Sequence, residues 1–171
     1  MNKAKYLLEL KSNLIKLSFC YGIKSPDMFF YDFGFGELIR TIDTYDGKIR
    51  KNSTFALHTS CAIEVIWRDG SKHIDVFLED TSCDKLNSVM ERLVGVPIKR
   101  VDLSEKNDLW LDLGVCWIVI ATNDDGEESW RFFDPNSDKP HLIASNELLA
   151  RSEEFYKKQE GTKKTGDGSL S

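Results

Sequence analysis

The spacing of apolar residues along the chain predicts three helices. In the first, residues 3–18, leucines recur at intervals of three and four and form one apolar stripe: Leu7, Leu10, Leu14 and Leu17. The second is expected over 82–94, where a hydroxyl side chain caps its start. The third is expected to run to Lys158 from a cap at Ser145 or Asn146.

Stretches rich in β-branched and aromatic residues predict strands between these helices. The clearest signal is a hairpin in which 54–68 and 72–78 are joined by a type I′ turn at Asp69-Gly70. The aromatic stretch 28–36 contains two glycines and is expected to be a loop or short strand in the core. A weak alternation predicts a strand over 37–44. Further short strands are expected after the second helix, at 97–103, 109–113, 115–122, 128–133 and 141–144.

These elements define the fold class as a single α+β domain with a mainly antiparallel sheet, made of a hairpin and a meander. Within the meander, 123–126 is expected to be a hairpin loop between neighbouring strands. A chain of 171 residues has the size of one ordinary domain, which is expected to cover 1–158. The remaining residues, 159–171, contain a single apolar side chain and are expected to form a disordered tail.

The composition is 41% hydrophobic and 30% charged, which is typical of a folded globular protein. No uncharged apolar run approaches the length that spans a bilayer, so no membrane association is expected. No signal-peptide pattern opens the chain, so a cytoplasmic location with reduced thiols is expected, although an even number of cysteines also permits two disulfides. The four cysteines are widely spaced: Cys20, Cys61, Cys83 and Cys116.

Charge is unevenly distributed along the chain, whose net charge is −5. The segment 101–138 holds ten acidic residues against Lys106 and Arg131, a net of −8. Such a segment argues against nucleic-acid binding, which needs a positive footprint. It is compatible with a basic protein partner, because summed charge steers association. The alternative is a solvated face that only keeps the protein soluble.

Tryptophans lie within this acidic segment. In 109–113 the alternation places Trp110 away from the leucines, and in 128–133 Trp130 is placed on one face with Phe132. Aromatic side chains among carboxylates predict a surface that binds a basic protein. The residues expected on it are Trp110, Asp112, Asp124, Asp125, Glu127, Glu128 and Trp130. The alternative is that both faces of the sheet are covered and every tryptophan is in the core.

A metal-dependent hydrolase is a second hypothesis. With a two-residue turn at 69–70, Glu64 lies opposite Asp75, and His73 is two positions along. A divalent metal held by both carboxylates would suit phosphodiester cleavage, whereas the alternative is an exposed pair screened by nearby cations. The order helix, hairpin, helix resembles the core of restriction-endonuclease-type nucleases, whose motif places acid-x-Lys on the second strand. Here Phe77 occupies the lysine position.

A thiol hydrolase is a third hypothesis. Cys83 is expected in the first turn of a helix, where backbone N–H groups favour a thiolate, and His58 or His141 would act as its base. Asp80 and Asp84 beside the thiol oppose a thiolate, so a structural cysteine is the alternative. The histidines and cysteines match no zinc spacing, and no glycine-rich nucleotide loop is present, so no metal and no cofactor are expected.

The sequence therefore favours a non-enzymatic protein-binding domain, such as an inhibitor or immunity protein that neutralises a basic partner, for example a toxin nuclease. The alternatives are a small metal-dependent or thiol hydrolase, with Glu64, Asp75, His73 and Cys83 as its candidate catalytic residues. A homodimeric assembly subunit, whose aromatic residues form the interface, is also an alternative.

Overall fold

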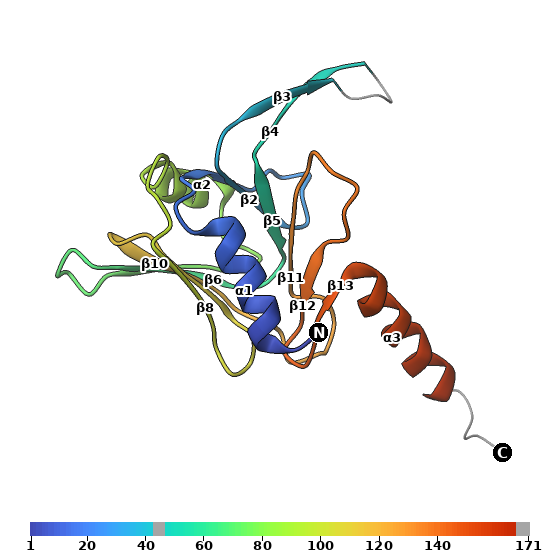
Figure 1. Cartoon of the computed structure of the whole chain (residues 1–171). Helices are drawn as coiled ribbons and strands as arrows, with labels where there is room; N and C mark the ends of the chain where they lie inside the picture. The colour runs from blue at the N-terminus through green and yellow to red at the C-terminus, as the bar shows by residue number, and fades with distance from the viewer. Residues whose placement is uncertain (43–46, 167–171) are drawn as a thin grey trace.

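The computed structural model describes residues 1–42 and 47–166, and it confirms the α+β class (Figure 1). Its three helices are α1 (Lys3–Leu14), α2 (Cys83–Glu91) and α3 (Ser152–Gly166). All strand pairs are antiparallel, but they form three sheets and not the single one expected. Within the described residues no helix has the length and apolarity that crossing a membrane requires.

Sheet I has six strands, which run across it in the order β1 (Phe19–Ile23), β2 (Tyr31–Phe35), β5 (Phe55–Thr59), β11 (Trp130–Phe133), β12 (Leu142–Ala144) and β13 (Leu149–Arg151). Sheet II has five, in the order β7 (Ile74–Phe77), β6 (Ile63–Trp67), β10 (Cys116–Ile120), β9 (Leu109–Asp112) and β8 (Arg100–Leu103). A ribbon of β3 (Ile39–Ile42) and β4 (Ile49–Asn52) extends from the body in Figure 1.

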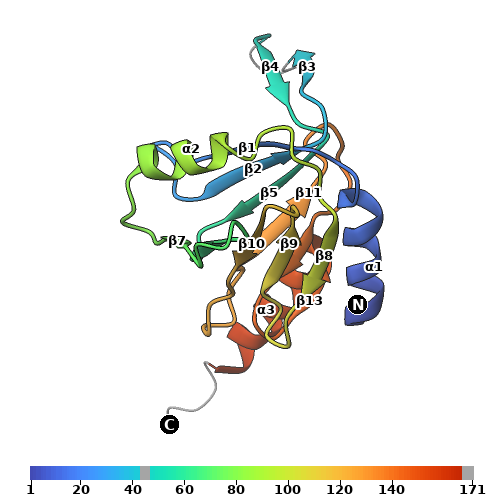
Figure 2. The same ribbon diagram turned by 90° about the vertical axis from the view of Figure 1, so that its left-hand side faces the viewer.

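Sheets I and II enclose one hydrophobic core. Phe33 and Leu57 of sheet I belong to the same buried cluster as Val65 and Ile118 of sheet II. The helices lie around the sheets: α1 contacts β8 and β13, α2 contacts β1, and α3 contacts β12 and β13 (Figure 2). The buried side chains of α1 are Tyr6, Leu10 and Leu14. One face of sheet I and one face of sheet II are therefore buried against each other.

Most of the expected strands are present, with shorter bounds, and the helix at 82–94 is α2 with Ser82 as its cap. The aromatic stretch 28–36 contains β2, whose buried side chains are Tyr31, Phe33 and Phe35. The first helix ends earlier than predicted, because Ile15 is extended and Lys16 has φ 76°. Strands β1, β4 and β13 were not predicted, and β13 lies where the third helix was expected.

The predicted strand 54–68 is wrong, because it is two strands in different sheets. At residues 60–62 the chain leaves sheet I and enters sheet II, and the Thr59 hydroxyl accepts a hydrogen bond from the Cys61 N–H at this corner (3.0 Å). The loop at 123–126 is likewise no hairpin, since β10 belongs to sheet II and β11 to sheet I. Both connections cross between sheets, which alternation along a single strand does not reveal.

The hairpin of β6 and β7 has a different register from the predicted one. Glu64 lies opposite Val76, and Asp75 lies opposite Val65. The loop is longer than two residues: Trp67 N–H donates to the His73 carbonyl (3.1 Å), and Lys72 has φ 54°. A shift of one residue moves a side chain to the other face, so Glu64 and Asp75 lie on opposite faces of sheet II.

The third helix begins later than predicted and extends further. Ser145 does accept hydrogen bonds from the next N–H groups, but they close a turn that leads into β13. Helix α3 starts at Ser152 and continues to Gly166, through part of the predicted tail. The last residues of that tail, 167–171, lie outside the described part of the chain.

Candidate docking surface

The side of sheet II that faces away from the core carries a continuous set of side chains, which we call the outer face. Alternation along each strand sends one set of side chains into the core and the other set outwards. The strand pairings align the outward residues in two rows. The first is Ile74, Ile66, Trp117, Asp112 and Arg100, and the second is Val76, Glu64, Val119, Trp110 and Asp102.

Two tryptophans form the centre of the outer face. The rings of Trp110 and Trp117 meet edge to face, with 5.8 Å between their centroids and 72° between their planes. Both side chains are partly exposed, and Val119, which lies opposite Trp110, is 7% exposed. Trp110 thus faces away from the core leucines as predicted, while Trp117 is a member of this surface that the sequence analysis missed.

Arginines frame the tryptophan pair. The guanidinium groups of Arg68 and Arg100 lie 4.8 Å and 6.0 Å from the centroid of the Trp117 ring. Arg68 pairs with Asp112 (3.3 Å), and Arg100 pairs with the carboxylate of Asp102. These ion pairs largely balance the charge of the outer face, which is less acidic than its carboxylates alone suggest. They also hold both guanidinium groups against the Trp117 ring.

The helices contact other parts of the fold. They contact β1, β8, β12 and β13, whereas β6, β9 and β10 are contacted mainly by other strands. Ile74 and Val76 at one side of the outer face are 47% and 41% exposed. Figure 2 shows α1 beside β8, at the opposite edge of this sheet. Lys11 of α1 reaches the outer face at that edge, where it pairs with Asp102 (3.7 Å), while Glu64, Trp110 and Trp117 at the centre are at least partly exposed.

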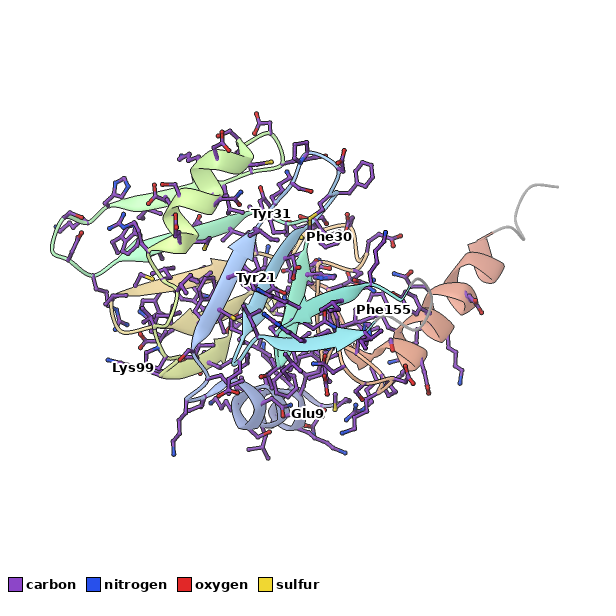
Figure 3. The ribbon with its side chains drawn as sticks, turned by 90° about the horizontal axis from the view of Figure 1, so that it is seen from above. Glu9, Tyr21, Phe30, Tyr31, Lys99 and Phe155 are labelled. Carbon is purple, nitrogen blue, oxygen red and sulfur yellow. The ribbon has the colours of Figure 1, made fainter. Side chains whose placement is uncertain are left out.

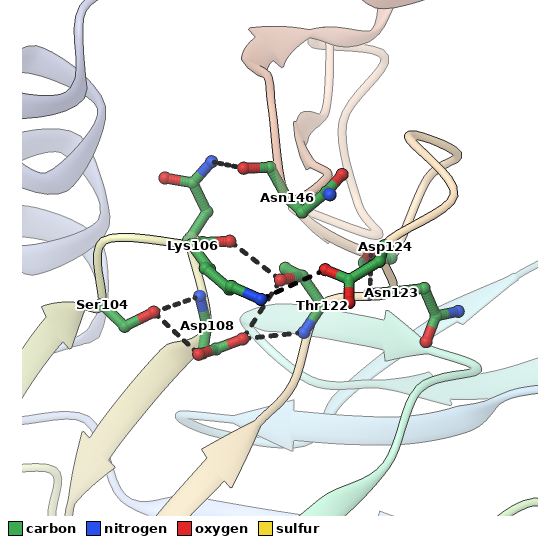
Figure 4. Close-up of polar contacts among 9 residues, drawn as sticks. Ser104, Lys106, Asp108, Thr122, Asn123, Asp124 and Asn146 are labelled. Atoms are coloured by element: carbon green, nitrogen blue, oxygen red, sulfur yellow. Dashed lines mark hydrogen bonds and ion pairs between the residues drawn. The ribbon is translucent and has the colours of Figure 1, made fainter.

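The other predicted acidic residues lie in the β10–β11 connection, which we call the acidic loop (123–128). Asp124 pairs with Lys106 (3.4 Å), and the base of the loop is fixed because Asp108 accepts hydrogen bonds from the N–H and hydroxyl of Thr122 (2.9 and 3.1 Å; Figure 4). The Asp125 carboxylate accepts from the Glu127 N–H (2.9 Å). The loop follows β10 directly and presents exposed carboxylates at the end of sheet II.

Glu128 and Trp130 do not belong to an open surface. Glu128 holds Arg131 (2.8 Å to one guanidinium nitrogen) and accepts a hydrogen bond from the Tyr156 hydroxyl (2.9 Å). Trp130 is 0% exposed, donates to the Asn107 carbonyl (3.2 Å) and meets the Tyr6 ring edge to face. The prediction that Trp130 binds a partner is therefore wrong. Its strand lies in sheet I with that face towards the core.

The carboxylate pair expected for a metal is not formed, because Glu64 lies on the outer face and Asp75 on the other. Asp75 instead accepts a hydrogen bond from the Trp67 indole N–H (2.8 Å) and contacts His73 Nε2 (3.1 Å). Burial raises the pKa of Asp75, but the bonds from Trp67 and His73 outweigh it, and the pKa is lowered overall. The described residues contain no group of three metal-ligating side chains.

The thiol site is not assembled either. Cys83 does lie in the first turn of α2, but His58 lies on β5 and His141 directly precedes β12, in a column of rings with Phe30 and Phe133. Phe30, labelled in Figure 3, stacks on His58 at 4.3 Å between centroids. Burial, followed by the charge of Arg131, lowers the pKa of His141. This ring column was not predicted, since its members lie on three separate segments of the chain.

Comparisons with models of protein families, with curated proteins and with solved structures give no match for this chain.

Proposed function

We propose that this chain is a non-enzymatic domain that binds a basic protein through the outer face, with the acidic loop as its electrostatic guide. An inhibitor or immunity protein that neutralises a basic toxin would use such a surface. The observation that carries the proposal is the pair Trp110 and Trp117, partly exposed on the outer face, where β9 and β10 are contacted mainly by other strands.

Aromatic side chains at the centre of an open surface support binding more than the total charge does. Tryptophan and arginine are the residues most enriched among those that dominate interface energy. On the outer face, Arg68 and Arg100 already lie against Trp117, so these long side chains are held in place before a partner arrives. This arrangement lowers the entropy cost of forming an interface.

The acidic loop supports the choice of a basic partner. The loop presents three exposed carboxylates, Asp124, Asp125 and Glu127. Lys106 pairs with Asp124 and offsets one of these negative charges. Charges at the rim of an interface raise the rate of association and select partners of opposite charge, while they add little to affinity. The loop is therefore assigned a steering role, and the tryptophans are assigned the anchoring role.

The test starts with the full chain as bait in a lysate of its native cells, followed by purification of the captured protein and measurement of its affinity. Trp110→Ala should weaken binding by about 2 kcal/mol, which is roughly a thirtyfold loss. Reversal of Asp124, Asp125 and Glu127 to lysine should slow association and reduce its dependence on salt. Hydrogen exchange should show protection of β9 and β10 in the complex.

Phe29→Ala is the matched control, because Phe29 is 95% exposed and belongs to the β1–β2 connection of sheet I and not to the outer face. It should leave the affinity unchanged. A captured protein that binds Trp110→Ala as tightly as the unmodified chain contradicts the proposal, and so does an acidic partner with salt-independent association.

A further inference from the structure

A pocket of about 370 Å³ lies where residues of α1 meet the core-side face of sheet I. Strands β5, β11 and β12 supply its apolar floor with Phe55, Phe132 and Leu142, and β13 adds Arg151. Leu142 lies opposite both Phe132 and Arg151, so these side chains share one face of the sheet. The volume is within the range of roughly 300–1,000 Å³ that is typical of pockets for small molecules.

The floor of this pocket is aromatic. The rings of Phe55 and Phe132 stack with 5.1 Å between their centroids and 26° between their planes. Phe132 is buried, whereas Phe55 is partly exposed. A flat ring laid on this pair would extend the stack, and such ring contacts contribute about 0.5–1.5 kcal/mol beyond the area that they bury. The floor therefore favours a ligand with an aromatic ring.

Two acids and two bases line the same pocket. Glu9 and Asp134 balance Lys139 and Arg151, so the charged side chains of the lining sum to zero. A ligand with a net charge would leave that charge unbalanced in the pocket, whereas a ligand with one positive and one negative group would not. The lining therefore favours a zwitterion over an anion or a cation.

Part of the hydrogen-bonding capacity of these charged groups is unused. Both Glu9 oxygens accept from Nη2 of Arg151 (2.9 Å each), and Asp134 Oδ1 accepts from the Asn136 N–H (2.9 Å). Within the described part of the chain, no bond is recorded for the other guanidinium nitrogens of Arg151, for Asp134 Oδ2 or for the Lys139 ammonium group. Glu9 thus holds Arg151 in place while leaving N–H groups free for a ligand.

We propose that this pocket binds a small zwitterion with an aromatic side chain, that is, an aromatic α-amino acid. The carboxylate of the ligand accepts hydrogen bonds from Arg151, whose N–H groups suit a carboxylate. The ammonium group donates to Asp134, and the ring lies on Phe55 and Phe132. None of the residues that line the pocket belongs to the outer face or to the acidic loop, so this site is separate from the proposed docking surface.

Calorimetric titration of the full chain with a matched set of ligands tests the chemistry. L-phenylalanine is the zwitterion, 3-phenylpropanoate lacks its ammonium group, 2-phenylethylamine lacks its carboxylate, and glycine lacks its ring. Phenylalanine should bind at least about tenfold more tightly than each of the others, because each of them loses one charge-assisted hydrogen bond or the ring contact.

A chain that does not bind phenylalanine overturns the proposal. So does a chain that binds 3-phenylpropanoate or 2-phenylethylamine as tightly as phenylalanine, because the pocket is then not selective for a zwitterion. Tighter binding of N-acetylphenylalanine would indicate the C-terminus of a peptide as the occupant, and it also overturns the proposal.

Substitution of Asp134 tests the contact with the ammonium group. Asp134→Asn keeps an acceptor for the Asn136 N–H but removes the charge, so it should weaken phenylalanine binding about tenfold without weakening that of 3-phenylpropanoate. Asp138→Asn is the matched control, because Asp138 is exposed in the same β11–β12 connection and does not line the pocket. It should leave both affinities unchanged. Equal effects of the two variants, or equal losses for the two ligands, overturn the assignment of Asp134.

Amide chemical shifts test the location of the site. Phenylalanine should shift the resonances of α1 around Asn13 and those of the β11–β12 connection, while those of β9 and β10 stay unchanged. Trp110→Ala should bind phenylalanine as the unmodified chain does, so the outcome does not depend on the docking surface. Shifts confined to β9 and β10 would place the ligand on the outer face and overturn the proposed site.

The aromatic floor is tested with Phe55→Leu, which keeps an apolar side chain but removes the ring. It should weaken phenylalanine binding about fivefold, because the ligand then stacks on one ring of the pair and not on both. Urea unfolding of the same variant checks that the fold is retained. An unchanged affinity in a folded Phe55→Leu chain overturns the role of the floor.

Discussion

Trp110 and Trp117 lie on neighbouring strands and meet edge to face on the outer face of sheet II, with 5.8 Å between their ring centroids. Val119, which lies opposite Trp110, is 7% exposed. The position of the tryptophan pair on the outer face, framed by two arginines, gives it a role as a preformed anchor. A substitution of Trp110 should therefore weaken partner binding more than it lowers the free energy of unfolding.

Trp130→Ala should destabilise the protein far more than Trp110→Ala. Trp130 is fully buried, so its removal leaves a cavity and costs about 3–5 kcal/mol of unfolding free energy. Trp110→Ala removes one partner of a partly exposed ring pair and should cost about 1 kcal/mol. Urea unfolding of the two variants measures the difference. Equal losses would contradict the assignment of Trp130 to the core and Trp110 to the surface.

Asn107 should tolerate glycine better than alanine. Its side chain donates to the carbonyls of Ser145 and Asn146 (2.9 and 3.3 Å), and its backbone has φ 69°. Asn107→Ala loses both bonds and adds strain, for a total of about 2–4 kcal/mol. Asn107→Gly loses the same bonds without the strain and should be about 1 kcal/mol more stable than Asn107→Ala. Thermal unfolding of both variants provides the measurement, and a more stable alanine variant would contradict it.

Periodicity predicted local features of this fold well and sheet membership poorly. The leucine stripe of α1 and the Ser82 cap of α2 depend on residues a few positions apart; the cap is present, and Leu10 and Leu14 of the stripe are buried, although Leu17 lies beyond the end of the helix. The break between β5 and β6 depends on the neighbours that each strand finds from far along the chain. The strand-like pattern of residues 54–68 continues through Cys61, because a corner between two sheets does not change the residue types within a single segment.

The candidate site shows the same limit. The position of Trp110 on an outward face followed from alternation within one short strand, and the structure agrees. Trp130 has a similar local pattern, yet sheet I buries that face. The pairing of Glu64 with Asp75 failed for a different reason: it depended on loop length, and Lys72 in the left-handed region lengthens the loop. A register shift of one residue places the two carboxylates on opposite faces of the sheet, where they cannot hold one metal ion together.

The four thiols should react in two classes. Cys20 and Cys83 are partly exposed, whereas Cys61 and Cys116 are buried. Burial, followed by the charge of Asp112, raises the pKa of Cys116 to about 11. At about pH 8 its thiolate fraction is then roughly one in a thousand. Peptide mapping after brief alkylation should find Cys20 and Cys83 modified first, with the buried pair modified only on unfolding. Early modification of Cys116 would contradict the packing of β10.

Asp75 should contribute to stability above its own pKa and cease to do so in acid. Its pKa is lowered on folding, so its stabilising contribution is complete above the unfolded value of about 3.9 and is lost as the pH falls through the folded value. Asp75→Asn keeps the shape of the side chain but removes its charge. The unfolding free energy of this variant should therefore fall below that of the unmodified chain near neutral pH, and the difference should shrink towards about pH 3.

His73→Ala removes one of the two partners and keeps the bond from Trp67, so it should reduce the pH dependence by less. If Asp75→Asn leaves the pH dependence of urea unfolding unchanged, the hydrogen bonds that Asp75 accepts in the observed register of β6 and β7 do not lower its pKa.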